Sequence, residues 1–249
     1  MSGTECIHGF ENHLCDSCFP KAVPVKPVTR ATTTSRAKRV PGAPRASANK
    51  LPALADQRVY HVTHISNLEN ILRTGQLVAA AQIETSILDV SSPLTRELRG
   101  TASLSTGEQV DRYVPFSLVP ESNSWRELRD GAAEPRWSDA ARTASSTDFV
   151  FIVTTIRALG DEAVLADGDA AASLTRFATD EDSMKRMLGN LRADELTDDA
   201  EVLIHGSFAF DEVQLVGVAS DRARDRVKEL LDAASFATKV AVYPPWFIQ

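Results

Sequence analysis

The sequence predicts an α+β fold, in which short strands and helices follow one another in mixed order and the strands pair antiparallel. Strand-like runs alternate irregularly with helical stretches, without the regular strand–helix–strand repeat of a parallel sheet. The sequence also has no glycine-rich phosphate loop, no Walker pattern and no Rossmann fingerprint. A doubly wound nucleotide-binding fold is therefore excluded, and any nucleotide must be bound by other means.

The composition is that of a soluble globular chain. The sequence has 249 residues, 43% of them hydrophobic, and a formal net charge of −7. No apolar run approaches the roughly 18 to 20 residues that span a bilayer. The first residues lack the basic and then apolar order of a signal peptide. We therefore expect a cytoplasmic protein that does not act at a membrane.

The charge divides the chain into three regions. Residues 1–18 carry three acidic side chains and no Lys or Arg, whereas residues 19–55 carry eight Lys or Arg and no acid. Residues 56–249 carry 19 basic and 31 acidic side chains and are expected to form the main domain. The basic region is rich in Pro, Ala, Thr and Ser and lacks periodicity, which is typical of a disordered linker. It either contacts nucleic acid or serves as a solubilising spacer.

All the cysteines of the chain lie within the first 18 residues. Cys6, Cys15 and Cys18, together with His8, supply the four ligands that tetrahedral zinc requires, and His13 could replace His8. Four protein ligands leave no position for a catalytic water, so the predicted zinc knuckle would be structural. Its folding energy would come from the metal, because so short a segment cannot bury enough apolar surface. The alternative is a tail whose cysteines bind nothing.

The main domain is predicted to begin with a strand at residues 58–63, where apolar and polar residues alternate. Ser66 is expected to cap the next helix, with Glu69 completing a capping box and Gly75 ending the helix. Further strands are predicted at residues 101–105, 113–119, 149–155, 163–165, 201–204 and 213–218, and further helices near 91–98, 171–177, 182–192 and 221–234.

A compact polar group follows the first predicted strand. His61 and Thr63 face the same side of the strand, and His64 and Asn67 lie at the turn into the helix. These four side chains could hold a ribose and a carboxamide. The alternative is structural: His61 would be a core histidine, His64 an exposed turn residue and Asn67 part of the start of the helix.

One carboxylate and two arginines are further candidates for chemistry. Glu201 opens a buried-looking strand, where a carboxylate is either solvent-facing or a positioned catalytic group. Arg96 and Arg99 could reach a phosphate or steer a reacting base, or could simply be solvated on a helix. No Ser–His–Asp order and no metal cluster can be read in residues 56–249. The candidates therefore favour a transferase that uses a bound cofactor.

Four sequence blocks, in order, resemble a known family. They are residues 60–68 with 71–75, residues 113–116, residues 200–204 and an aromatic end at residues 243–246. In this pattern the chain resembles the DarT family, DNA base ADP-ribosyltransferase toxins that are paired with a macrodomain antitoxin. The resemblance implies an ADP-ribosyltransferase fold with a split β-sheet core and flanking helices. It also implies transfer of ADP-ribose from NAD to a nucleobase in single-stranded DNA, with release of nicotinamide.

The resemblance also assigns roles to residues. It implies that His61 and Thr63 hold the nicotinamide ribose and carboxamide of NAD, and that His64 and Asn67 complete the NAD site. Glu201 would be the catalytic glutamate that stabilises the oxocarbenium-like transition state. A further implied residue, Arg96, would contact the cofactor phosphates and assist deprotonation of the target base, with Arg99 as the alternative.

The chain departs from the family pattern in two places that would lie near the acceptor nucleotide. Residues 117–125 replace a usual aromatic pair and Ser-Pro-Met segment, and Asp169 stands where a histidine is expected. The target base, and the choice between DNA and RNA, are therefore open. The alternatives are transfer to RNA or protein, and a catalytically inactive nucleic-acid-binding module. A polyanion would require a local basic cleft, which we expect at Arg96, Arg99 and Arg112.

Overall fold

The computed structural model describes residues 51–83, 88–132 and 136–248. The predicted zinc ligands Cys6, His8, Cys15 and Cys18 and the linker up to residue 50 lie outside these residues. Within the described ranges, no group of three or more His, Cys, Asp or Glu side chains could hold a metal ion. No helix in these ranges is long and apolar enough to cross a membrane.

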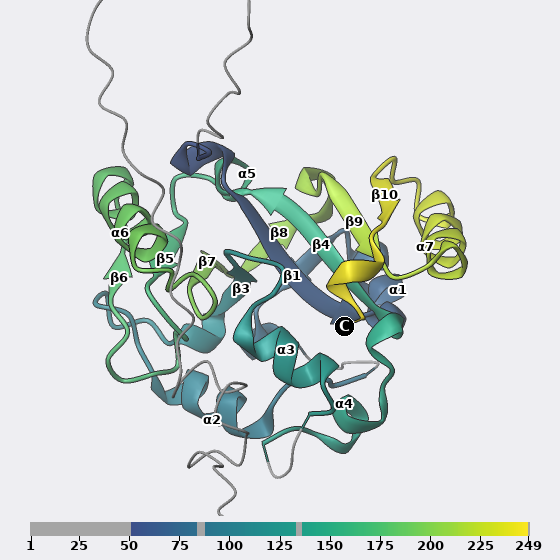
Figure 1. The fold of residues 1–249 in the computed structure, drawn as a ribbon, viewed down its shortest axis with the longest axis horizontal. Helices are drawn as coiled ribbons and strands as arrows, with labels where there is room; N and C mark the ends of the chain where they lie inside the picture. Colours follow the sequence, from purple (N-terminus) through teal and green to yellow (C-terminus); the bar gives the residue numbers. More distant parts are fainter. Residues whose placement is uncertain (1–50, 84–87, 133–135, 249) are drawn as a thin grey trace, which may run out of the picture. The chain divides into compact units, whose positions relative to one another are not determined.

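The described residues form a mixed α+β domain around an eight-stranded sheet, which confirms the predicted fold class (Figure 1). The strand order is β10-β9-β4-β1-β3-β7-β5-β6, and every neighbouring pair is antiparallel except β9 and β10. A second sheet pairs β2 (Gln76–Val78) with β8 (Ser207–Ala209). The large sheet contains β1 (Arg58–His64), β3 (Tyr113–Ser117), β4 (Phe149–Thr155), β5 (Val164–Ala166), β6 (Phe177–Ala178), β7 (Glu201–His205), β9 (Leu215–Val218) and β10 (Lys239–Val242).

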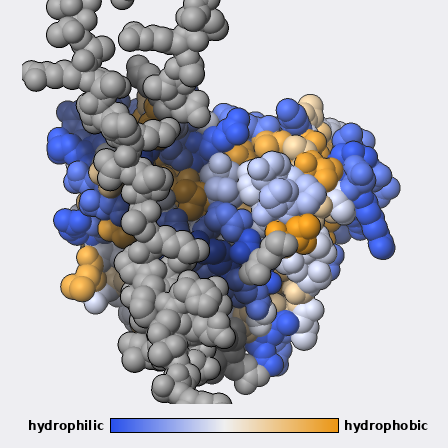
Figure 2. Space-filling view, in the orientation of Figure 1, coloured by the Kyte–Doolittle hydropathy of each residue, from blue (hydrophilic) through white to orange (hydrophobic). Residues whose placement is uncertain are grey.

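Helices cover both faces of the large sheet. Buried leucines and valines of α1, α6 and α7 pack with one set of strand residues into the largest core cluster. Their outward sides are hydrophilic over α6 and α7 (Figure 2), as expected of amphipathic surface helices. On the other face, Trp125 and Phe247 pack with aromatic residues of β4. The α-helices are α1 (Ile65–Thr74), α2 (Pro93–Thr101), α3 (Asn123–Arg129), α4 (Asp139–Thr143), α5 (Ile156–Leu159), α6 (Glu181–Ala193) and α7 (Asp221–Ala233).

The large sheet is split between its two central strands. β1 pairs with β4 at seven consecutive positions, but its register with β3 is a single pair, Tyr60 with Ser117. Pro115 lies in β3 beside the split. The N–H and C=O of a strand residue point to the same side, and the Pro115 carbonyl faces His61 of β1. The N–H that proline lacks would therefore also face β1, where β1 and β3 form no continuous hydrogen-bond ladder. The proline is therefore compatible with an opening of the sheet at this position.

The start of the first helix differs from the prediction. His64 is the N-cap, and its Nδ1 accepts a hydrogen bond from the Ser66 backbone N–H at 3.2 Å. Ser66 lies within α1 and is not its cap, so the predicted capping box with Glu69 is wrong. The histidine ring supplies the acceptor that a Ser or Asp would usually provide. The helix ends as predicted at Gly75, which has a φ of 72°.

Two predicted elements are corrected. Residues 101–105 do not form a strand, because α2 extends through Thr101 and the next segment makes only an isolated bridge between Ser103 and Gln109. Residues 171–177 do not form a helix. The Asp169 carboxylate accepts the Ala171 N–H at 2.9 Å, so a local side-chain bond competes with helical pairing. The segment ends in the short strand β6 instead.

The C-terminal segment closes the aromatic face of the sheet. Trp246 packs against Tyr60 and Phe151, with ring centroids 5.6 and 5.1 Å apart. Gly217 of β9 leaves the space for this ring, because a Cβ built there would lie 2.6 Å from the indole Cζ3. We conclude that this strand position requires glycine for packing.

We predict that Gly217→Ala destabilises the domain by about 1–3 kcal/mol, because the added methyl overpacks the Trp246 contact. The melting temperature should fall by about 2–4 °C for each kcal/mol. Gly189→Ala is the control, since a Cβ on this α6 glycine meets nothing within 4 Å. It should stabilise the helix by roughly 0.5–1 kcal/mol. An unchanged or higher melting temperature for Gly217→Ala would contradict the packing argument.

Candidate active site

A cleft of about 1280 Å³ opens where the central strands separate. Residues of β1, β3, β7, α2 and α3 line it, together with parts of the loops that precede α2 and α4. Three residues predicted from the sequence, His61, Arg96 and Glu201, lie on its wall, as do Arg99 and Asp169. Arg112 does not line it. The cleft therefore joins residues that are far apart in the sequence.

A buried ion pair lies in this cleft. Arg99 Nη1 donates to Glu201 Oε2 at 2.9 Å, and the two side chains are 11% and 20% exposed. Glu201 is the first residue of β7 and lies opposite Ser117 of β3, while Arg99 lies in the last turn of α2. Burial raises the pKa of Glu201, and the Arg99 charge opposes that rise. The nearby Asp169 carboxylate raises the same pKa further.

One nitrogen of this pair has no partner in the described part of the chain. Arg99 Nη2 is buried and makes no hydrogen bond to any described residue. A buried donor without an acceptor costs about 1–3 kcal/mol, so native proteins rarely leave one unsatisfied. This N–H group is therefore suited to an acceptor oxygen that a ligand brings into the cleft.

His61 lies at the split of the sheet. Its Nδ1 is 2.9 Å from the Pro115 carbonyl oxygen, which can only accept, so Nδ1 carries the proton. The ring also packs against Phe116, with centroids 5.7 Å apart. Burial lowers the pKa of His61, which favours the neutral form. Its Nε2 is then left as a hydrogen-bond acceptor.

Three other predicted NAD-site residues, Thr63, His64 and Asn67, do not line the cleft. Asn67 Nδ2 donates to the Leu88 carbonyl at 2.8 Å, and Asn67 Oδ1 accepts from the Leu88 N–H at 2.9 Å. Asn67 Nδ2 also lies 3.3 Å from Thr63 Oγ1, and His64 caps α1. These side chains therefore hold the start of α1 against the segment that leads to α2.

Each arginine on the cleft wall is paired with an acid. Arg96 lies 2.6 Å from Asp89, Arg126 lies 2.7 Å from Asp198 and Arg136 lies 3.2 Å from Glu127, in addition to the Arg99 pair. The cleft therefore differs from the uniformly basic groove expected for a polyanion. An arginine has five N–H donors, so each can bind a ligand oxygen while keeping its carboxylate partner.

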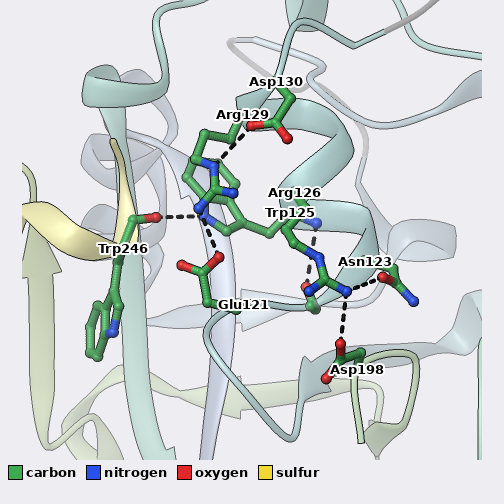
Figure 3. A network of polar contacts seen from close by, with 9 residues as sticks. Glu121, Asn123, Trp125, Arg126, Arg129, Asp130, Asp198 and Trp246 are labelled. Atoms are coloured by element: carbon green, nitrogen blue, oxygen red, sulfur yellow. Dashed lines mark hydrogen bonds and ion pairs between the residues drawn. The ribbon is translucent and has the colours of Figure 1, made fainter. Parts of the chain in front are cut away.

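Helix α3 forms a wall of the cleft that the sequence prediction missed. Trp125 donates its indole N–H to the Trp246 carbonyl at 2.7 Å, and Arg129 is bonded to Glu121 and Asp130 (Figure 3). Ser122 caps the helix by accepting from the Trp125 N–H. This serine, directly before residues 123–129, is the signal that could have indicated the helix.

The fold and the sequence both match known proteins. The DNA ADP-ribosyl transferase of Thermus sp. (strain 2.9) is 25% identical over 205 residues, which cover 76% of this chain and 95% of that protein. The structure of Thermus sp. 2.9 DarT in complex with ADP-ribosylated ssDNA has a TM-score of 0.66 at 22% identity, covering 77% of this chain and 96% of that one. Its complex with NAD+ has a TM-score of 0.65 at 21% identity, covering 79% and 100%.

A family-level match covers most of the domain. The family described as ssDNA thymidine ADP-ribosyltransferase, DarT, matches residues 60–248. The match includes β3, all of β1 from Tyr60 onward, Arg99 and Glu201, and therefore the whole of the buried ion pair. The chain belongs to the DarT family of single-stranded DNA ADP-ribosyltransferases.

Proposed function

We propose that this DarT-family enzyme transfers ADP-ribose from NAD to a thymidine base of single-stranded DNA, with Glu201 and Arg99 at the reacting centre. The observation that carries this assignment is the buried Arg99–Glu201 pair with its unpartnered Nη2 in a large cleft. The cleft of about 1280 Å³ exceeds the roughly 300–1,000 Å³ of ordinary small-molecule sites. It therefore has room for a dinucleotide together with an acceptor base.

In the proposed reaction, the glycosidic bond between nicotinamide and the ribose C1′ breaks, and the bonding electrons leave with nicotinamide. A ring nitrogen of thymine forms the new bond to C1′ and loses its proton. Glu201 stabilises the positive charge that develops on the ribose. Its raised pKa also makes it a better base, so it accepts the thymine proton and passes it to water.

Arg99 has two parts in this proposal. One N–H group keeps Glu201 in place, and the free Nη2–H group can donate to a thymine carbonyl oxygen as the ring becomes negative. A guanidinium does not accept a proton at neutral pH, so this help is electrostatic. Arg96 is 47% exposed and could contact the NAD phosphates. We thus propose that the two arginines divide the role that the resemblance gave to Arg96.

The neutral His61 is proposed to accept a hydrogen bond from a ribose hydroxyl through Nε2. The proposed role of Thr63, His64 and Asn67 is to position the NAD site. Asn67 holds Leu88, which precedes the cleft residues Val90 and Ser91, while Thr63 contacts Asn67 and His64 caps α1. The alternative acceptors are RNA and protein side chains. A catalytically inactive nucleic-acid-binding module is a further alternative, but it gives no reason for a carboxylate with a raised pKa in the cleft.

We predict that Glu201→Gln lowers the rate of transfer by about 10²–10⁴-fold, because it removes the charge that stabilises the transition state. Arg96→Gln should cost at most about fivefold, the effect of one exposed ion contact. Mass analysis of a thymidine-containing oligonucleotide incubated with each protein and NAD measures the adduct. RNA and a total protein extract are the parallel acceptors. An adduct that forms equally well with Glu201→Gln would overturn the catalytic assignment.

A pH profile tests the coupling between Arg99 and Glu201. The rate should fall as the pH drops through the pKa of Glu201, since only the carboxylate is active. Arg99 lowers this pKa, so Arg99→Gln should move the acid limb of kcat/KM to higher pH. Arg99→Lys retains the charge and is the matched control, with an acid limb near that of the wild type. Coincident acid limbs for Arg99→Gln and Arg99→Lys would contradict the coupling.

The N-terminal region and the partner extend the proposal. We propose that Cys6, His8, Cys15 and Cys18 bind one structural zinc ion, on the chemistry of the four ligands alone. The arginines of the cleft are paired with acids, which limits their contacts to DNA phosphates. The basic residues 19–50 would add further contacts to these phosphates. The family resemblance further suggests a toxin whose modification a macrodomain antitoxin reverses.

Metal analysis tests the zinc proposal directly. The full chain should contain about one zinc per molecule after removal of loosely bound metal. Cys15→Ser together with Cys18→Ser should abolish this content. His8→Ala and His13→Ala, measured separately, identify the fourth ligand. Zinc at or below background in the full chain would refute the knuckle.

A further inference from the structure

Trp137 is the tryptophan of the cleft that takes no part in the core. Trp125 is buried, and Trp246 packs against the same aromatic cluster. Trp137 belongs to none of the core clusters, lines the cleft and is partly exposed. Packing within the described core clusters therefore does not explain the position of this large aromatic side chain in the cleft.

A single carboxylate of α3 holds this side chain in place. Glu127 Oε2 accepts from the Trp137 indole N–H at 3.3 Å, and Glu127 Oε1 accepts from Arg136 Nη1 at 3.2 Å. Both contacts come from adjacent residues and use the two oxygens of one carboxylate. The indole and the guanidinium are therefore fixed side by side, which lowers the entropic cost of binding a ligand.

The Arg136 guanidinium beside the indole is suited to binding the phosphate of a nucleotide. Arg136 and Glu127 are each 44% exposed, compared with 11% and 20% for Arg99 and Glu201. The group therefore lies in a more open part of the cleft than the reacting centre. Glu127 is neutralised by Arg136, whose remaining N–H groups are available to a phosphate oxygen.

We propose that Trp137, Arg136 and Glu127 form a nucleobase-stacking subsite. The indole face takes a purine or pyrimidine ring, Arg136 contacts the attached phosphate, and Glu127 positions both. This inference rests on the proposed function, because it names a contact for the substrates of the same cleft. Because the subsite lies in an open part of the cleft, we favour as its ligand a base of the DNA strand next to the target base. The adenine of NAD is the other ring that could stack there.

The test measures binding without turnover. Each variant is made in the full-length Glu201→Gln protein, and intrinsic fluorescence is titrated with oligothymidylate and, separately, with NAD. Stacking on Trp137 should quench its fluorescence, and Trp137→Phe should remove this quenching while largely keeping affinity. Trp137→Ala should raise the Kd for oligothymidylate roughly five- to 150-fold, the usual effect of losing one stacked base. Affinity of the two variants is measured by fluorescence anisotropy of a labelled oligonucleotide.

Control variants distinguish loss of base stacking from a general loss of binding. Leu98→Ala removes another partly exposed apolar side chain, one that does not line the cleft, and should leave both affinities unchanged. Glu127→Ala should weaken binding as Trp137→Ala does, because it releases the indole and the guanidinium. A loss confined to NAD would assign the stacked ring to adenine. Unchanged affinity for both ligands in Trp137→Ala, with native melting behaviour, would overturn the subsite. Adduct formation by wild-type protein would in that case leave the proposed function standing.

Discussion

The buried pairing of Arg99 with Glu201 is the interaction on which the site depends. Placing two opposite charges in the interior costs several kcal/mol of desolvation for each ion, which only a fixed geometry with further hydrogen bonds can repay. Here the two partners come from α2 and β7, 102 residues apart in the sequence. One guanidinium nitrogen has no acceptor among the described residues, which leaves it for a ligand oxygen. The fold thus maintains a charge arrangement whose full stabilisation requires substrate.

The walls around this pair are fixed by interactions of a different kind. At the split between β1 and β3, Pro115 lacks the N–H that a ladder would use, and His61 donates to its carbonyl. Another wall, α3, is attached to the C-terminal segment through the Trp125 indole and the Trp246 carbonyl. Truncation or overpacking at the C-terminus should therefore affect the cleft, although Trp246 and Phe247 do not line it.

The sequence was sufficient to predict the elements whose residue pattern is set by neighbours in the chain. The strand at 58–63 and the helices near 182–192 and 221–234 have clear periodicity, and Glu201 stands at the start of a strongly apolar strand. The choice between Arg96 and Arg99 could not be made, because both lie on the cleft side of one helix and only the position of β7 shows which reaches Glu201. Ion pairs between distant segments leave no local signal, and neither does the capping of α1 by a histidine ring.

The central claim is that Arg99 and Glu201 act as one unit, and a double-mutant cycle on the transfer rate tests it most directly. Arg99→Gln, Glu201→Gln and the double variant are compared with wild type by single-turnover kinetics on a thymidine-containing single strand. If the two residues act as a unit, the double variant should be no slower than the slower single variant. Losses that multiply would show that the residues act independently and would contradict the account.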